Sequence, residues 1–576
     1  MVRAVLGMKA VAQQWKGGLV GLLLGMCIVY LLQDTPTPTL LTPFYQAWSG
    51  ASYCKPPQQQ PTKGHSILNM DHTYFQHAAG IVIGSEHGDA NLQRDQLKLL
   101  LAAWEASSTS FLKGVGDPSL GGHNILPSIV PKAPHLENCE DRSTFNRKLD
   151  SWDHNGTLPY WTLWKGEGFG LHMDMVSDTL KADKNVSMQS LYPPWVEGAD
   201  EDNLPLTRQV QVDIWKHQHP QDCESPSLRF LLADWETDPG FGIGAQIASM
   251  AGLLAVAFTE QRILVSNYYN RADHEECLGS NHARWSCYFL SETSEDCRNR
   301  ALLLASQSTA WVQGLITDKS NYTSRQIWVG KTPRQWGKPW EAIQPTTQID
   351  GKMLVHHKAA DRRWWRAQAV RYLMRFPSKY TCLLLNEARH KAFGVEAAKL
   401  VLDSLHYSWP KETLSQNETD IEQFVWKFRK PWLPRPLVSI HVRQGDKAKE
   451  MKVVGFEDYM KLAQQLRNWF PAARHIWLST EMQEVIEESK AYSRWWDIYY
   501  TNVSRQTGNT SMPAYEASLG RATSTNYPLV NFLLSADADF FIGALGSTWC
   551  YLIDGMRTTG GKVMAGYLSV NKYRFW

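Results

Sequence analysis

Short apolar runs alternate with helical patterns over more than half of the chain. From about Arg229 the sequence LRFLLADWETDPGFGIGAQIASMAGLLAVAFTEQRILVSN predicts a strand, a glycine-rich loop, an apolar helix and a second strand ending near Val265. Such a strand–helix–strand unit favours a parallel sheet, because the crossover helix returns the chain to the same edge. After Asp361, RRWWRAQAVRYLMRF has a helical period with a basic face.

A second alternation follows nearer the C-terminus. Four runs predict strands (RPLVSIHV, RHIWLST, WWDIYY and DFFIGAL), and four segments between and after them predict helices (GFEDYMKLAQQLRNWF, EMQEVIEESKAYSR, NYPLVNFLLSADA and STWCYLIDGMRTTG). The pattern predicts an α/β fold class with two open, Rossmann-like α/β domains, at residues 221–430 and 431–576.

The N-terminal part has the pattern of a membrane anchor. Residues 17–33 carry no charge, and Arg3, Lys9 and Lys16 precede them. This predicts a transmembrane signal anchor, a cytosolic tail at residues 1–16 and a luminal body. A cleaved signal peptide is the alternative, but the following DTPTPTLLTP lacks a clear small-x-small cleavage site. Residues 34–64 are rich in Pro, Thr and Gln and predict a stem, and residues 65–220 are mixed, with helical spacing in NLQRDQLKLLLAAWEASSTSFL.

Composition agrees with a luminal, globular body. A net charge of +2 with 43% hydrophobic residues argues against disorder and against bulk attraction to nucleic acid. Of the 9 cysteines, all but Cys27 lie outside the anchor, and no CxxC spacing suggests zinc or redox chemistry, so a disulfide set is expected. N-glycosylation sequons occur at Asn155, Asn185, Asn321, Asn417, Asn502 and Asn509. We therefore expect a type II membrane protein of the Golgi or the endoplasmic reticulum.

A charged cluster follows the strand PLVSIHV. In open α/β sheets, ligands bind beyond the carboxyl ends of the strands, and an arginine placed there can present its fork to a diphosphate. A solvated charged loop is the alternative interpretation. The cluster contains His441, Arg443, Asp446, Lys447 and Glu450.

Two further segments are candidates for the same edge. In PGFGIGAQ, Gly240, Gly242 and Gly244 would let backbone amides approach a pyrophosphate at a helix N-terminus, although such a turn is often only a tight turn. In FLLSADADFFIGALGSTWC, the DxD motif ending at Asp539 is expected at the entry end of a strand, and Ser547 at the end where ligands bind. No metal site is expected from the DxD motif.

In their order, these segments resemble the GDP-fucose-dependent fucosyltransferases, and most closely the core α1,6-fucosyltransferase. The similarity covers about Cys223 to Cys550 and includes HVRQGDK, GFGIGAQIASMAGLLAVAFTEQRILV, WWRAQAVRYLMR and LSADADFFIGALGSTWC. It implies a GT-B-like fold and an inverting, metal-independent glycosyltransferase that moves fucose from GDP-fucose to a glycan or glycoprotein, with no cofactor.

The resemblance also implies roles for individual residues. Arg443 would bind the β-phosphate, and Glu450 would be the general base, held in position by Lys447. The expected donor-binding residues are His441 at the guanine, Asp446, the backbone of Gly242, Ile243 and Gly244, Asn531 and Ser547. By the same analogy, Cys223 would form a disulfide with Cys297.

Several features depart from the family pattern: the loop from Lys447 to Glu450 is one residue shorter, and Glu481 alone stands in place of paired aspartates. Gln444 stands where the family has a second arginine, and Asn531 where it has a guanine-reading aspartate. These departures leave two alternatives: a transferase of the same fold with another nucleotide-sugar donor, or a non-catalytic glycan-binding protein. The presence of both Arg443 and Glu450 favours an enzyme over the second alternative.

Overall fold

The structure is a computed structural model. It describes residues 89–113, 130–150, 207–235, 242–272, 277–329, 346–349, 352–356, 362–405, 409, 431–449, 451–508, 510–544, 546–559 and 567–570. All of them belong to one compact unit, Glu86–Trp576. The expected tail, anchor and stem lie outside the described residues. Within the described ranges, no helix combines the length and apolarity needed to cross a membrane.

The first sheet is parallel and has the order β2-β1-β3. Its strands are β1 (Arg229–Ala233), β2 (Arg262–Ser266) and β3 (Ile316–Asp318). The chain runs from β1 through one helix to β2, and then back across to β3 on the other side of β1. The carboxyl ends of β1 and β3 therefore form a topological switch point, where open α/β sheets bind ligands.

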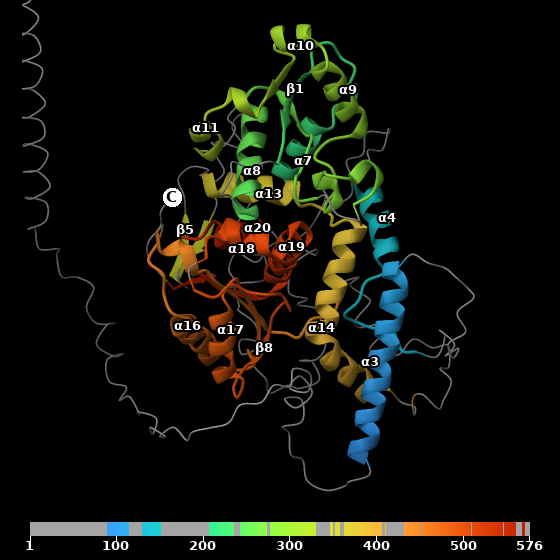
Figure 1. Cartoon of the computed structure of the whole chain (residues 1–576), viewed down its shortest axis with the longest axis vertical. Coiled ribbons are helices and arrows are strands. Elements are labelled where there is room, and N and C mark those ends of the chain that lie inside the picture. Colours follow the sequence, from blue (N-terminus) through green and yellow to red (C-terminus); the bar gives the residue numbers. More distant parts are fainter. Residues whose placement is uncertain are drawn as a thin grey trace, which may run out of the picture. The chain divides into compact units, whose positions relative to one another are not determined.

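Helix α8 (Ile243–Thr259) is apolar on most sides because it is covered on most sides. It contacts β1 and β2 of the first sheet, and also α11 (Ser324–Val329), α13 (Arg362–Leu373) and α20 (Thr548–Thr559), as Figure 1 shows. One core cluster joins α8, α13 and α20. Helix α20 follows the strand Phe540–Gly543 in the C-terminal α/β region, so this core connects the two α/β regions.

The second sheet is parallel, five-stranded, and has the order β10-β9-β6-β7-β8. Its central strand β6 is buried at every position, as expected for a parallel strand covered on both faces. The strands are β6 (Leu437–Val442), β7 (His475–Thr480), β8 (Asp497–Tyr499), β9 (Phe540–Gly543) and β10 (Tyr567–Ser569). The prediction of parallel α/β sheets in both regions is confirmed.

The remaining elements surround these two sheets. Figure 1 shows α3 (Asp89–Lys113) beside α14 (Lys379–Ser404). The other helices are α4 (Cys139–Leu149), α7 (Thr207–Gln218), α9 (Glu295–Ala305), α10 (Ser308–Val312), α16 (Phe456–Trp469), α17 (Gln483–Ser489), α18 (Met512–Leu519) and α19 (Arg521–Asp537). Short 3-10 turns lie at Gly279–Asn281, Trp285–Cys287, Lys319–Asn321, Gly445–Lys449 and Lys490–Tyr492, and a hairpin is formed by β4 (Thr346–Ile349) and β5 (Lys352–His356).

The described cysteines and sequon asparagines can be compared with the expected disulfides and glycosylation sites. Cys223 is bonded to Cys297, the pairing that the resemblance implied. Two more disulfides join Cys139 to Cys382 and Cys277 to Cys287, and Cys550 is a buried free thiol. The sequon asparagines Asn321 and Asn502 are exposed. The other sequons (Asn155, Asn185, Asn417 and Asn509) and Cys54 lie outside the described residues.

Gly252 permits the close contact between α8 and α11. A Cβ built at Gly252 would lie 1.9 Å from the carbonyl oxygen of Ile327. We expect Gly252→Ala to lower the free energy of unfolding by about 1–3 kcal/mol, because the overpacking outweighs the gain in helix propensity. Urea denaturation measures the change.

Gly394→Ala in α14 is the matched control for this prediction. The first neighbour of a Cβ at Gly394 would be the His390 side chain, at 3.1 Å, on the same helix. Its unfolding free energy should change by no more than about 1 kcal/mol. Equal losses in the two variants would contradict the account of the α8–α11 contact.

Candidate functional site

Arg443 lies just beyond the carboxyl end of β6, with only 13% of its side chain exposed. Its guanidinium pairs with the carboxylate of Glu481, donates to Asp446 Oδ1 over 2.6 Å and donates to the Gln444 carbonyl over 2.8 Å. Burial disfavours the charge, but Glu481 and Asp446 outweigh it and raise the pKa of Arg443 above its usual value. The site thus contains a permanent cation held in a fixed orientation.

A turn at Gly445 brings Asp446 back toward Arg443. Gly445 has a φ of +59°, in the left-handed region that glycine adopts without strain. Asp446 Oδ2 also accepts the backbone N–H of Met512, over 3.0 Å, at the start of α18. Burial opposes ionisation of Asp446, but the Met512 amide and Arg443 together lower its pKa. Asp446 therefore joins the Arg443 loop to α18.

Helix α18 also contacts the first α/β region. Glu516 Oε2 accepts from Arg271, over 2.7 Å, and Arg271 donates to Gln246 Oε1 on α8, over 3.1 Å. A Cβ at Gly242 would lie 3.2 Å from Glu516 Oε1 and 3.8 Å from Met512 Cγ. Burial is the main cause of a raised pKa at Glu516, and Arg271 partly opposes it. Through α18, the glycine-rich turn and the Arg443 loop become neighbours.

The glycine-rich turn forms the N-terminus of α8. Gly242 is the N-cap, Ile243 begins the helix, and the first N–H groups of any helix lack partners within it. Gly244 packs against α20, where a Cβ would lie 2.9 Å from Trp549 Cε3. Ser547, which is 2% exposed, lies just before that helix. The glycine-rich turn therefore contacts the helix that follows Ser547. The sequence predicted that both segments lie at the edge where ligands bind.

Buried polar side chains line the α19 side of the second sheet. Ser439 Oγ and Ser535 Oγ are 2.8 Å apart. One step further toward the carboxyl ends, His441 Nδ1 lies 2.7 Å from Ser479 Oγ, and Asn531 Nδ2 donates to Thr501 Oγ1 over 3.3 Å. Burial, with a smaller contribution from Arg443, lowers the pKa of His441 to about 3, so its imidazole is neutral.

Several of these polar groups have an atom without a protein partner. The atoms without a partner are His441 Nε2 and Asn531 Oδ1. In Gln506, a further buried side chain at this edge, both Oε1 and Nε2 lack a partner. An unsatisfied buried polar group costs about 1–3 kcal/mol, and such groups are uncommon in native proteins. Their position at the carboxyl edge fits a bound ligand that supplies the missing hydrogen bonds.

Glu450, the expected base, lies outside the described residues. The next residue, Met451, packs on Gly546, where a Cβ would lie 2.8 Å from Met451 Cβ. Met451 is therefore in contact with the residue that precedes Ser547. Lys447 is half-buried in the 3-10 turn after Arg443.

The DxD motif lies away from this edge. Asp539 is fully buried, pairs with Arg435 and accepts the Leu437 N–H over 2.8 Å. Leu437 is the first residue of β6, so Asp539 lies at the entry end of the sheet, as the sequence predicted. Its contacts are those of a structural carboxylate.

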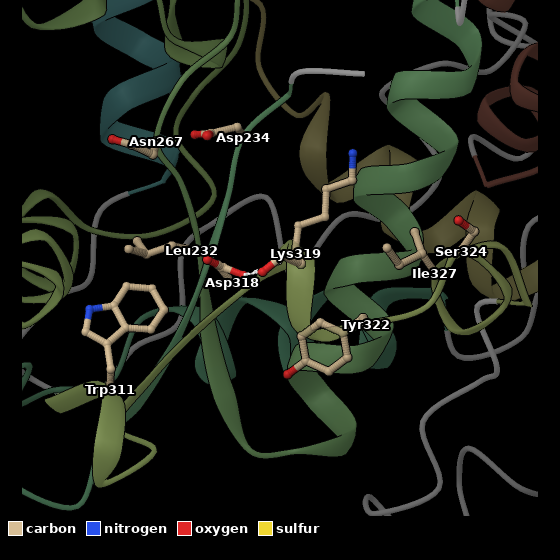
Figure 2. A pocket seen from close by; sticks show the side chains of 10 residues that line it. Leu232, Asp234, Asn267, Trp311, Asp318, Lys319, Tyr322, Ser324 and Ile327 are labelled. Carbon is tan, nitrogen blue, oxygen red and sulfur yellow. Dashed lines mark hydrogen bonds between the residues drawn. The ribbon is translucent and has the colours of Figure 1, made fainter. Parts of the chain in front are cut away.

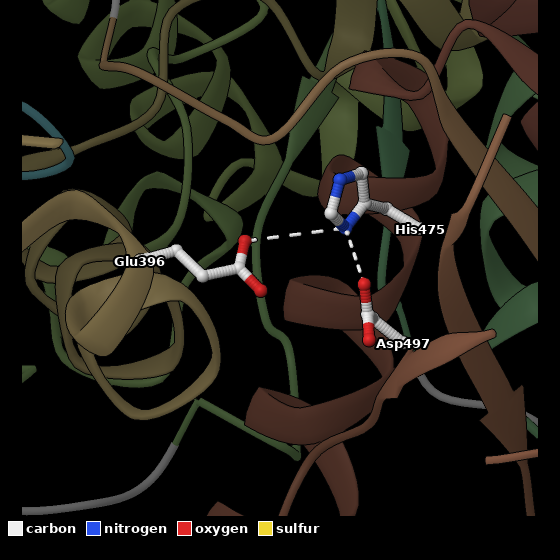
Figure 3. Close-up of side chains that lie close together, drawn as sticks. All are labelled: Glu396, His475 and Asp497. Atoms are coloured by element: carbon white, nitrogen blue, oxygen red, sulfur yellow. Dashed lines mark ion pairs between the residues drawn. The ribbon is translucent and has the colours of Figure 1, made fainter. Parts of the chain in front are cut away.

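Glu396, His475 and Asp497 form a second group of ionisable side chains (Figure 3). His475 Nδ1 lies 3.9 Å from Glu396 Oε2 and 3.5 Å from Asp497 Oδ2, and the ligand atoms lie within 4.8 Å of one another. Asp497 also pairs with Arg474, over 2.7 Å, and Glu396 accepts from Tyr499. Since His475 pairs with Leu437 in the sheet, this cluster lies at the end opposite Arg443.

A pocket of about 550 Å³ opens at the carboxyl ends of the first sheet (Figure 2). Asp234 and Asn267 follow β1 and β2, and Asp318 ends β3, so the pocket includes the switch point. The rings of Trp311 and Tyr322 supply apolar surface. Aromatic faces beside two carboxylates and one amide suit a sugar, which presents both C–H faces and hydroxyl groups. No motif in the sequence pointed to this pocket, because its residues come from four separate segments.

Comparisons with known proteins find similarity in structure alone. No protein-family model matches the chain, and no curated protein matches it in sequence. Solved structures that match include NodZ, an α1,6-fucosyltransferase co-crystallised with GDP (12% identity, TM-score 0.28, 57% of this chain and 92% of that chain). POFUT1 in complex with GDP matches at 12% identity and a TM-score of 0.24, over 60% of this chain and 98% of that chain. A mutant of Arabidopsis thaliana FUT1 in complex with GDP matches at 10% identity and a TM-score of 0.26, over 63% of this chain and 76% of that chain.

Proposed function

We propose that the chain is an inverting, metal-independent glycosyltransferase that moves fucose from GDP-fucose to a glycan or glycoprotein. The observation that carries the proposal is the buried Arg443, fixed by Glu481 and Asp446 at the carboxyl edge of a parallel sheet. Through α18 it neighbours the glycine-rich N-terminus of α8. A fixed guanidinium and a helix N-terminus together suit a diphosphate.

The proposed roles of the residues follow from the negative charge that develops on GDP as fucose is transferred. Attack by an acceptor hydroxyl breaks the bond between fucose C1 and the β-phosphate oxygen, and the electron pair stays on GDP. Arg443 would stabilise this charge, assisted by Ser547 and by the amides of the turn at Gly242–Gly244. Glu450 would take the hydroxyl proton, with Lys447 holding the carboxylate in position. Attack from the side opposite the leaving diphosphate inverts the sugar carbon.

The unsatisfied polar atoms support a nucleobase beside the diphosphate. A neutral His441 offers Nε2, and Asn531 Oδ1 accepts one hydrogen bond, as from a ring N–H of guanine. A carboxylate would accept two such bonds, so base recognition here is expected to depend on more than Asn531.

The pocket of the first sheet supports a carbohydrate acceptor. Its two rings and its carboxylate and amide groups match the alternating apolar and hydroxyl surfaces of a glycan.

We propose that the enzyme acts in the secretory pathway, as a type II membrane protein of the Golgi with its body in the lumen. The uncharged residues 17–33 and the sequons support this location.

A donor and acceptor screen tests the proposal. The purified luminal region is incubated with GDP-fucose, GDP-mannose, UDP-GlcNAc or UDP-galactose, with and without a pool of N-glycans, and nucleotide release and glycan mass are measured. We expect GDP release from GDP-fucose and a deoxyhexose added to the glycan. Turnover of another donor, or of none, would contradict the proposal.

Chelation tests the expected independence from metal. Excess EDTA should change the rate of transfer by less than about twofold, because Arg443 supplies the positive charge that a metal supplies elsewhere. Rates with and without EDTA are compared on the same preparation, with added Mn²⁺ as the control. A tenfold loss restored by Mn²⁺ would contradict the prediction, and Glu396→Gln would then test the second cluster.

A further inference from the structure

Gln506 is a buried side chain beside Arg443 that no motif identified. It is 6% exposed, and neither its Oε1 nor its Nε2 has a hydrogen-bond partner in the protein. Because both ends of the carboxamide lack a partner, exchanging the oxygen and nitrogen positions would not change this finding.

The backbone holds Gln506 in a fixed place. Its N–H donates to the Glu481 carbonyl over 3.0 Å, and its carbonyl accepts from Gln483 over 2.9 Å. Glu481 is also the residue whose carboxylate pairs with Arg443. Gln506 and Arg443 thus both bind Glu481, the residue that follows β7, one through its backbone N–H and the other through its guanidinium.

The side chain of Gln506 points to the Arg443 turn. From a Cβ built at Gly445, Gln506 Nε2 would lie at 3.3 Å, Met482 Sδ at 3.4 Å and Arg443 Nη1 at 3.9 Å. A side chain at residue 445 would crowd these groups, and glycine lets them approach the turn. The carboxamide therefore lies in the immediate surroundings of the group assigned to the β-phosphate.

We propose that Gln506 binds hydroxyl groups of the donor sugar, an assignment that rests on the proposed function. A phosphate oxygen only accepts hydrogen bonds and would leave Oε1 unsatisfied. A sugar hydroxyl both donates and accepts, and two adjacent hydroxyls can satisfy both ends of the carboxamide. The sugar is attached to the β-phosphate, so its hydroxyls lie within reach of a group beside Arg443.

Binding of GDP and GDP-fucose to Gln506→Leu separates this role from nucleotide binding. We expect the Kd for GDP-fucose to rise about tenfold and the Kd for GDP to change less than about twofold, measured by titration calorimetry. The melting temperature without ligand should be equal to or higher than that of the wild type, since leucine removes an unsatisfied polar group. Gln506→Met, which is unbranched like glutamine, should give the same ratio of Kd values.

Gln218→Leu is the matched control for the melting temperature. Gln218 is fully buried, and its carboxamide bonds the carbonyls of Leu264 and Glu292 and the Leu264 N–H. Its replacement should lower the melting temperature, because three hydrogen bonds are lost. A similar fall in Gln506→Leu would overturn the assignment, since it would indicate a structural role.

The outcomes distinguish the assignment from the proposed function. Equal weakening of GDP and GDP-fucose, or weakening of neither, overturns the role of Gln506 alone. Failure of the wild type to bind GDP overturns the proposed function, and the role of Gln506 with it.

Discussion

Arg443→Ala is expected to lower kcat/KM for GDP-fucose about 100- to 1,000-fold, because the cation that faces the developing diphosphate charge is lost. The substitution also leaves the buried Glu481 and the partly exposed Asp446 without their counterion, and the loss at the buried carboxylate costs about 3–5 kcal/mol of stability. Arg443→Lys keeps the charge but loses the planar fork, so its kcat/KM should fall between those of the wild type and Arg443→Ala. Steady-state kinetics are measured together with thermal unfolding of each variant.

Arg435→Lys is the matched control for this prediction. Arg435 pairs with the fully buried Asp539 at the entry end of the same sheet, away from the proposed donor. Its replacement should lower stability without changing kcat/KM for the folded protein. If the two lysine variants had the same kinetics, Arg443 would have only a structural role.

Glu450→Gln is expected to lower kcat about 100- to 10,000-fold, because the amide cannot accept the proton of the acceptor hydroxyl. The Kd for GDP should change by less than about twofold, since the proposed role of Glu450 is at the acceptor hydroxyl and not at the nucleotide. Kinetics on a saturating glycan acceptor and calorimetry with GDP measure the two quantities. The pattern of lost turnover with retained binding is the signature of a general base.

Glu457→Gln is the control for Glu450. Glu457 is exposed in the first turn of α16 and pairs with Lys461, so its replacement should leave both quantities unchanged. Retained turnover in Glu450→Gln would contradict the assignment. The carboxylate to test next would be Glu516, whose pKa is raised mainly by burial and which lies at the glycine-rich turn.

The sheets could be predicted because their signals are local. The runs LRFLLA and RILVS become β1 and β2, and the pattern from PLVSIHV to DFFIGAL becomes β6 to β9 in the expected order. Apolar runs of this length between helical segments favour buried parallel strands. The strands β3 and β10 and the β4–β5 hairpin were not predicted, because the mixed polar and apolar residues of ITD, YLS, TTQI and KMLVH give no clear strand pattern.

The site could be predicted only in part. Arg443 and the glycine-rich turn were found because strand ends and glycine spacing are visible in the sequence. The residues that complete the site were not found, because their partners are distant: Arg271 and Glu516 are 245 positions apart, and Arg443 and Glu481 are 38 apart. Gln506 gave no signal at all, because a single glutamine becomes notable only once its burial and missing partners are known.

Titration of the purified luminal region with GDP, UDP and ADP tests most directly whether the carboxyl edge of the second sheet is a GDP-sugar site. The account predicts one GDP bound per chain, at least about tenfold tighter than UDP or ADP, and loss of this binding in Arg443→Ala. No binding of GDP, or equal binding of all three nucleotides, would contradict it.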